Sequence, residues 1–321
     1  MMANVPSRQN RQDAHNGSSE SSDRAEKRRE PERRRGSGRV QDRPQAPASV
    51  RALLHHLGLR PYKQMGQNFL VDEDVLDRIL RAADLRFRDT VVEVGPGLGV
   101  LTKELAKLVS RVIAVELDRG LAAALTKMLA GFASVEIINQ DVLQFDPARY
   151  VEDRAYKLVA NLPYYITSPA LRHFLESDAR PELMVVMVQK EVAQRIVAKP
   201  GDMSLLAVSV QYYGNPTLLF TVPASAFYPP PKVDSAVIKV QVYERPVVDV
   251  PPEKFFRVVE AGFSRRRKQL HNALSQSIWL PPNAAIETLR AAGIDEKRRA
   301  QTLSLDEWAR LSRELERRGF L

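Results

Sequence analysis

Residues 90–161 alternate short apolar runs with segments of helical periodicity, and this alternation is the strongest constraint on the fold. The apolar runs are VVEV, RVIAVELD, SVEIINQDV and YKLVAN, and helical patterns separate the first three. Strands that alternate with helices pair in parallel, because each helix carries the chain back across a face of the sheet. The sequence therefore predicts an α/β fold with a doubly wound, mostly parallel sheet.

The flanking segments extend this pattern. Apolar positions in VDEDVLDRILRAADL fall on one helix face, with Asp72 as the N-cap. ELMVVMVQKEVAQRIV predicts a further strand and helix, and both LAVSVQYYG and DSAVIKVQVY are interpreted as strands. RPVVDVPPE, near residue 250, is a Pro-rich linker. Beyond it, FFRVVEAGFSRRRKQLHNALSQSI and the rest of the chain are predicted to be helical throughout.

Composition excludes several kinds of site and favours a polyanionic partner. The chain has no Cys and five His, which excludes a disulfide scaffold and a thiolate nucleophile and leaves no metal site to expect. No apolar run approaches the roughly 20 residues that span a bilayer. We expect no signal peptide, no membrane contact and a cytoplasmic location. The formal net charge is +9, of which residues 1–50 carry 11 − 7 = +4, so the folded part is also basic.

Four predicted strands end in residues suited to binding a nucleoside. The first ends in Glu93-Val94-Gly95-Pro96-Gly97-Leu98-Gly99, and its glycines allow close approach of the backbone to a ligand. The next end at Glu116, whose spacing from the loop suits a ribose diol, and at Asp141, an acceptor for an adenine amino group. Such a pattern is shared by NAD and S-adenosylmethionine sites. The short G-P-G-L-G loop favours a nucleoside over a pyrophosphate.

The fourth strand ends in Asn161-Leu162-Pro163-Tyr164, which suits transfer to an adenine amino group. The N6 lone pair of adenine is delocalised into the ring. The Asn161 carbonyl and a backbone carbonyl of the Leu162-Pro163 segment can accept both N6 protons, which exposes that lone pair. Pro163 stiffens the turn, and Tyr164 can stack on the extruded base. The predicted catalytic group is therefore Asn161, Leu162, Pro163 and Tyr164.

The sequence resembles the KsgA/RsmA family of small-subunit ribosomal RNA adenine N6-dimethyltransferases over roughly residues 50–321. The matching segments are GQNFLVDEDVL, VVEVGPGLGVLT, VIAVELD, QDVLQFD, VANLPYYI, VQKEVAQRI, SAFYPPPKVDSAV and FSRRRKQLHNAL. The resemblance implies a class I, Rossmann-like methyltransferase that uses S-adenosylmethionine. It also implies transfer of four methyl groups to two adjacent adenosines near the 3′ end of 16S rRNA. The implied cofactor contacts are Asn68, Leu70, Gly95, Gly97, Glu116, Asp141 and Asn161.

Three other features gain meaning from the resemblance. Phe227 and Tyr228 precede three prolines, and an aromatic ring there could close the base pocket opposite Tyr164; Phe227 is the selected candidate. A basic segment is the candidate for binding RNA phosphates; it comprises Arg265, Arg266, Arg267 and Lys268. Relatives often have Asn after the NLPY tyrosine, whereas this chain has Tyr165, which puts the pocket wall in question.

The predicted organisation has three parts. Residues 1–48 form a disordered basic tail in which Arg33 to Arg35 could touch nucleic acid, 49–246 the methyltransferase domain, and 247–321 a helical RNA-binding domain. We expect a monomer acting on 16S rRNA or the immature small subunit. Three alternatives stay open: a NAD-dependent oxidoreductase, a non-catalytic RNA-binding relative, and a large-subunit rRNA methyltransferase of the resistance type.

Overall fold

A computed structural model describes residues 50, 52, 54–55, 67–151, 155–265 and 267–321. The described residues belong to one compact unit, Pro44–Leu321. The predicted tail over residues 1–48 and the Arg266 position lie outside the described residues.

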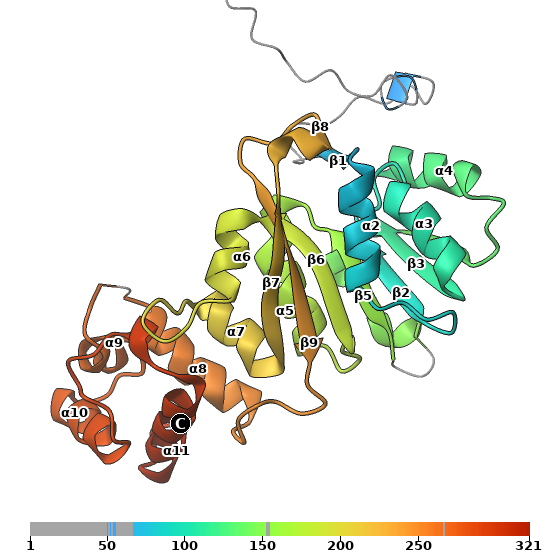
Figure 1. The fold of residues 1–321 in the computed structure, drawn as a ribbon. Helices are drawn as coiled ribbons and strands as arrows, with labels where there is room; N and C mark the ends of the chain where they lie inside the picture. Colours follow the sequence, from blue (N-terminus) through green and yellow to red (C-terminus); the bar gives the residue numbers. More distant parts are fainter. Residues whose placement is uncertain (1–49, 51, 53, 56–66, 152–154, 266) are drawn as a thin grey trace, which may run out of the picture. The chain divides into compact units, whose positions relative to one another are not determined.

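A seven-stranded sheet forms the centre of this unit (Figure 1). Five neighbouring strands are parallel, and β9 runs antiparallel to both of its neighbours. The predicted α/β class and mostly parallel sheet are confirmed. In order across the sheet, the strands are β4 (Val135–Asn139), β3 (Arg111–Glu116), β2 (Thr90–Val94), β5 (Lys157–Asn161), β6 (Leu183–Gln189), β9 (Ser235–Val242) and β7 (Gly214–Val222). A separate two-stranded sheet pairs β1 (Phe69–Leu70) with β8 (Phe227–Tyr228).

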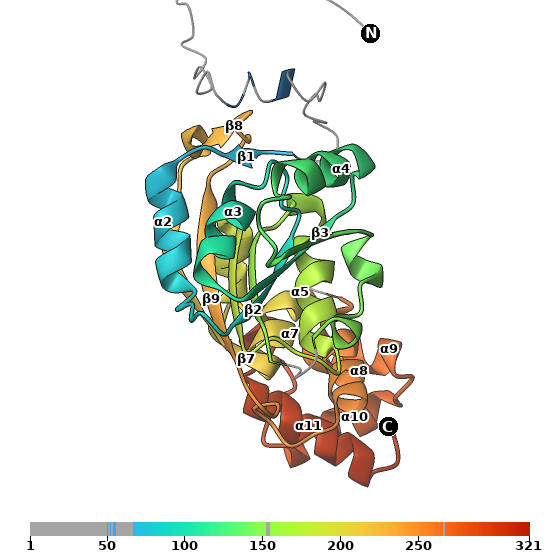
Figure 2. The same cartoon turned by 90° about the vertical axis from the view of Figure 1, so that its right-hand side faces the viewer.

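Helices cover both faces of the sheet (Figure 2). On one face, α2 (Glu73–Ala82) and α3 (Val100–Leu108) pack on Val91 and Val112. On the other, α5 (Thr167–Glu176) and α7 (Leu205–Tyr213) belong to one hydrophobic cluster with Val92 and Ile113. Neighbouring strand residues point to opposite faces, so both halves of these apolar runs are buried. Two further helices, α4 (Arg119–Met128) and α6 (Lys190–Ile196), follow β3 and β6.

One local prediction differs from the structure, and one strand was not predicted. The apolar segment LAVSVQYY, predicted as a strand, lies in helix α7, where the Ser204 hydroxyl caps the helix by accepting from Ala207 N at 3.1 Å. Nearly all of its side chains are buried, and a short apolar run buried on all sides has no periodicity that separates helix from strand. The strand is instead β7, whose Pro216 is tolerated because β7 lies at the edge of the sheet.

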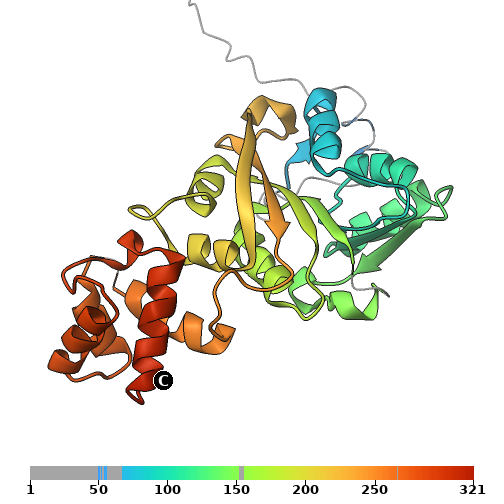
Figure 3. The same cartoon turned by 60° about the horizontal axis from the view of Figure 1, so that its bottom comes forward.

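The chain ends in four helices (Figure 3), and Trp308 in the last of them belongs to the hydrophobic cluster that they share. This side chain is fully buried, and a Cβ on Gly262 would lie 2.4 Å from its ring. The helices are α8 (Pro252–Phe263), α9 (Leu270–Ser277), α10 (Pro282–Ala291) and α11 (Leu305–Arg317). The helical C-terminal region is confirmed, although α8 ends at Phe263 and the basic segment lies in a turn. One hydrophobic cluster continues from the sheet into these helices, and the division at residue 247 stays a prediction.

Within the described residues, the structure contains no helix of the length and apolar character needed to cross a membrane.

Candidate active site

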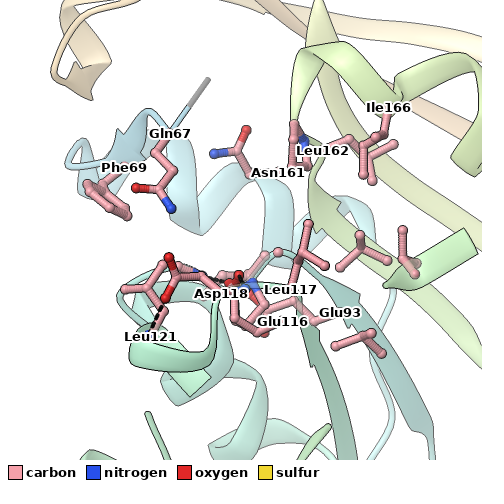
Figure 4. Close-up of a pocket in the computed structure, with 18 of the residues that line it drawn as sticks. Gln67, Phe69, Glu93, Glu116, Leu117, Asp118, Leu121, Asn161, Leu162 and Ile166 are labelled. Atoms are coloured by element: carbon pink, nitrogen blue, oxygen red, sulfur yellow. Dashed lines mark hydrogen bonds between the residues drawn. The ribbon is translucent and has the colours of Figure 1, made fainter. Parts of the chain in front are cut away.

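The carboxyl ends of β2, β3, β4 and β5 meet at one edge of the sheet and surround a cavity of about 340 Å³. The chain leaves β2 towards β3 and β4 and later returns to place β5 on the opposite side. Such a switch point is where open α/β sheets bind ligands. Figure 4 shows Gln67 and Asn161 on one side of this cavity, with Glu116 and Asp118 on the other. The predicted residues that line it are Asn68, Leu70, Gly95, Gly97, Glu116, Asp141, Asn161, Leu162, Pro163 and Tyr164.

The glycine loop after β2 adopts a backbone that only glycine takes up readily. Gly95, Gly97 and Gly99 have φ of +64°, +59° and +75°. A side chain at Gly97 would also have too little space, because its Cβ would lie 3.1 Å from the Phe69 ring. The Gly95 N–H donates to the Val115 carbonyl at 3.0 Å and fixes the loop against β3. The loop thus presents bare backbone to the cavity, as predicted from its composition.

Glu116, at the end of β3, connects the glycine loop after β2 to the segment that follows β3. Its Oε2 accepts from Gly97 N at 3.2 Å, and its Oε1 accepts from Asp118 N at 2.9 Å. Burial raises the pKa of this carboxyl, while the backbone N–H donors lower it in part. Each carboxylate oxygen has a second lone pair available. The group is therefore both a structural tie and an acceptor for a ligand diol.

Glu93 is a lining residue that sequence reasoning did not select. Only 2 % of its surface is exposed, and burial raises its pKa to about 8. The nearby Thr102 hydroxyl lowers the pKa in part, although neither Thr102 Oγ1 nor Glu93 Oε2 has a hydrogen-bond partner within the described residues. A buried carboxyl of this kind is stabilised by a cationic ligand. S-adenosylmethionine carries a sulfonium and an ammonium group, so the site fits this cofactor.

Asp141 and two leucines complete the wall beside β3. The Asp141 Oδ1 accepts from Leu143 N at 2.9 Å and caps the short 3-10 turn η2 (Val142–Gln144). Its other oxygen can accept from a ligand amino group. Leu117 and Leu143 line the cavity although 48 % and 38 % of their surfaces are exposed. Exposed leucines offer flat apolar contact for a purine ring. Their exposure is visible only in the structure, so no signal in the sequence would select these two residues.

Asn161 is held in a defined orientation at the end of β5. Its Nδ2 donates to the Asn68 main-chain carbonyl at 3.1 Å, so the amide oxygen is the end available to a ligand. Asn68 thus contributes to the site through its backbone. The Pro163 carbonyl already accepts from Ile166 N at 3.1 Å and Thr167 Oγ1 at 3.3 Å. The Leu162 carbonyl is therefore the better candidate for the second acceptor.

A sequence model of ribosomal RNA adenine dimethylases matches residues 59–317 of this chain. The chain belongs to the ribosomal RNA adenine dimethylase family. Its similarity to named relatives extends over most of its length. A ribosomal RNA small subunit methyltransferase A from Dehalococcoides mccartyi is 51 % identical over 270 residues, which is 84 % of this chain and 93 % of the relative. The protein of the same name from Moorella thermoacetica is 48 % identical over 282 residues, 84 % of this chain and 98 % of its own.

Solved structures agree with this family assignment. A dimethyladenosine transferase from Plasmodium falciparum superposes with a TM-score of 0.68 at 26 % identity, covering 78 % of this chain and 98 % of its own. The 23S rRNA methyltransferase ErmE superposes with a TM-score of 0.61 at 29 % identity, covering 78 % of this chain and 100 % of its own. The class I methyltransferase fold, and S-adenosylmethionine as the cofactor of this dimethylase, follow from the family.

The two aromatic residues predicted to hold the base lie in different environments in this dimethylase. Tyr164, in the 3-10 turn η4 (Tyr164–Ile166), lines the cavity, and its hydroxyl lies 2.6 Å from Ser235 Oγ. Burial raises the pKa of Tyr164. Phe227 is 2 % exposed, does not line the cavity, and packs in the core cluster beside Leu70. The alternation along β8 turns this ring towards the core, and its predicted role opposite Tyr164 stays a prediction.

Tyr165 occupies the position where relatives of the dimethylase often have Asn. It lines the cavity with 55 % of its surface exposed. Burial raises its pKa, and the charges of Glu116 and Asp141 raise it further. Tyr165 is therefore part of the cavity wall, and the groups of the predicted chemistry line the same cavity.

The described residues of the basic segment lie between α8 and α9, and none of them lines the cavity. Arg265, Arg267 and Lys268 are exposed there. Exposed cations in a turn present their charges in several directions and are accessible to phosphates. Their predicted role in binding RNA stays a prediction for this dimethylase.

Proposed function

We propose that this protein uses S-adenosylmethionine to dimethylate the N6 amino groups of two adjacent adenosines in the 3′-terminal hairpin of 16S rRNA. The modification belongs to the biogenesis of the small ribosomal subunit. The position of Asn161 supports this most strongly. Its amide is held by the Asn68 main chain, and its oxygen faces the cavity between the glycine loop and Tyr164.

The cavity offers a distinct binding partner for each part of the cofactor. Glu116 is the acceptor for the ribose diol, Asp141 for the adenine amino group, and Glu93 is the counter-charge for the cationic end. When bound, the cofactor supplies an electrophilic methyl group. The protein provides alignment and fixed dipoles and needs no strong base.

The target amino group is activated by hydrogen bonding. We assign Asn161 Oδ1 and the Leu162 carbonyl as acceptors for the two N6 protons. Both acceptors are fixed before the substrate arrives, since Leu162 N donates to the Met187 carbonyl at 3.1 Å. Tyr164 stacks on the flipped adenine, and its bond to Ser235 fixes the plane of the ring.

A large-subunit substrate is the second candidate, favoured by the structural similarity to ErmE. Sequence identity favours the small subunit, because relatives named for it reach 51 % identity against 29 % for ErmE. The substrate also implies action where immature subunits are assembled, in the cytoplasm. We also propose that the protein acts as a monomer.

The deciding experiment is methylation of small subunits that lack the modification, compared with unmodified large subunits and free rRNA. We expect cofactor-dependent dimethyladenosine at two adjacent positions near the 3′ end of 16S rRNA. Asn161→Ala serves as the inactive control. Methylation of 23S rRNA alone would favour the second candidate and overturn the proposal.

A further inference from the structure

The most exposed large apolar side chain in the described part of the chain is Trp279, in the connection between α9 and α10. Its surface is 89 % exposed. The two residues beside it are buried or partly buried. Leu280 is 4 % exposed, and both Leu280 and Ile278 belong to or pack against the hydrophobic cluster of the C-terminal helices. Burial on both sides fixes the connection and turns the indole outward.

The backbone at this position is also unusual. Trp279 has φ of +58°, a left-handed conformation that a bulky residue rarely adopts. Strained positions of this kind persist where the surrounding structure holds them, and they are concentrated at functional sites. A large aromatic ring held in solvent by a strained backbone indicates a contact surface.

Trp279 and the basic turn follow two helix ends that are in contact. The Ser264 and Ser277 hydroxyls lie 2.6 Å apart, which joins the end of α8 to the end of α9. The basic turn starts one residue after Ser264, and Trp279 follows Ser277 by two residues. Within the described chain, none of the cations Arg265, Arg267 and Lys268 forms an ion pair. The exposed aromatic ring and these cations therefore follow, within a few residues, two helix ends that touch each other.

We propose that Trp279 stacks on an unpaired base of the ribosomal RNA while the basic turn neutralises the flanking phosphates. Cations alone bind any phosphate backbone, whereas an indole ring stacks only on a base that is free of its helix. The site would therefore select single-stranded or bulged RNA, remote from the cavity. The positive charge favours RNA over an apolar protein surface as the partner. This inference rests on the proposed function.

Fluorescence tests the contact directly, since the chain has two Trp and the other, Trp308, is fully buried. The full-length protein is titrated, without cofactor, with a single-stranded RNA and with a duplex of equal length. We expect quenching by the single strand, and much less by the duplex. Trp279→Phe should keep most of the affinity but lose the quenching. Trp279→Ala should weaken single-strand binding about 5- to 150-fold with an unchanged salt slope.

Three comparisons make the result interpretable. Phe87→Ala, at an aromatic residue that is 76 % exposed elsewhere on the protein, is the matched control and should bind like the wild type. Trp279→Gly relieves the strained φ, so it should fold at least as stably as the wild type and bind RNA as weakly as Trp279→Ala. Arg267→Ala should reduce the salt slope, unlike any Trp279 variant.

The outcomes separate this inference from the proposed function. If the wild type methylates small subunits but Trp279→Ala binds single-stranded RNA normally, the stacking role is wrong and the enzyme assignment stands. If the wild type quenches on single-stranded RNA but methylates no rRNA, the contact stands and the proposed reaction is wrong. Equal losses in Trp279→Ala and Phe87→Ala would also overturn the inference.

Discussion

Replacing Glu93 by Gln isolates the energetic effect of one buried carboxyl group. The folded protein retains the Glu93 proton up to about pH 8, whereas the unfolded chain releases it near the ordinary value of 4.5. Between these pH values the folded state holds more protons than the unfolded state. The free energy of unfolding therefore falls as the pH rises, and the loss is complete above about pH 8. The Gln variant has no such proton and should lack this loss.

The magnitude follows from the pKa difference, 8 − 4.5, or about 3.5 units. Each unit corresponds to about 1.4 kcal/mol, so the loss is at most about 5 kcal/mol between pH 4.5 and pH 8. We expect the wild type and Glu93→Gln to have similar unfolding free energies at about pH 5, and the variant to be more stable by several kcal/mol at about pH 8.

Urea unfolding of both proteins across this pH range is the measurement. Groups other than Glu93 titrate in both proteins, and their contributions cancel in the difference. Parallel stability curves would refute the reasoning and show that the carboxyl titrates normally. Cofactor binding gives an independent check, because a cationic ligand favours the ionised carboxyl. Binding to the wild type should release protons below about pH 8, and Glu93→Gln should bind more weakly without that release.

The remaining predictions concern the cavity and the basic turn. Glu116→Ala should weaken cofactor binding by roughly 1.5–3 kcal/mol, measured by calorimetry, and unchanged affinity would remove Glu116 from the ligand contacts. Asn161→Ala should slow single-turnover methylation by about 10²–10³ while cofactor and RNA still bind; a near wild-type rate would contradict the assigned role. Tyr164→Phe should keep most activity, because the ring does the stacking, whereas Tyr164→Ala should weaken target binding by roughly 1–3 kcal/mol. Arg267→Ala combined with Lys268→Ala should lower the salt slope of RNA binding by somewhat under two units, and an unchanged slope would place the phosphates elsewhere.

The central sheet could be predicted from the sequence because its physical cause is local. Parallel strands buried on both faces need continuous apolar runs, and the ends of β2, β3 and β5 show where ligands bind. The prediction of a strand in place of helix α7 was wrong for a related reason. Burial on all sides removes the periodicity that identifies a helix.

The site was predictable in residue type but less so in environment. Gly95, Glu116 and Asn161 were selected by position along the strands, and the structure places all three at the cavity. The burial of Phe227 and the missing partner of Glu93 depend on how distant segments pack. The burial of Phe227 follows from the pairing of β1 with β8, and no local sequence pattern predicts that pairing.

The bond from Asn161 to Asn68 has a consequence for how this protein tolerates mutation. The acceptor at residue 68 is a main-chain oxygen, so exchange of the Asn68 side chain leaves that acceptor in place. Adding or removing one residue between 68 and 72 would instead shift the oxygen by about 3.3 Å and break the bond. For this one hydrogen bond, the length of the segment matters more than the side chain at residue 68. A library of single-residue insertions and deletions would reveal this constraint where alanine substitution would not.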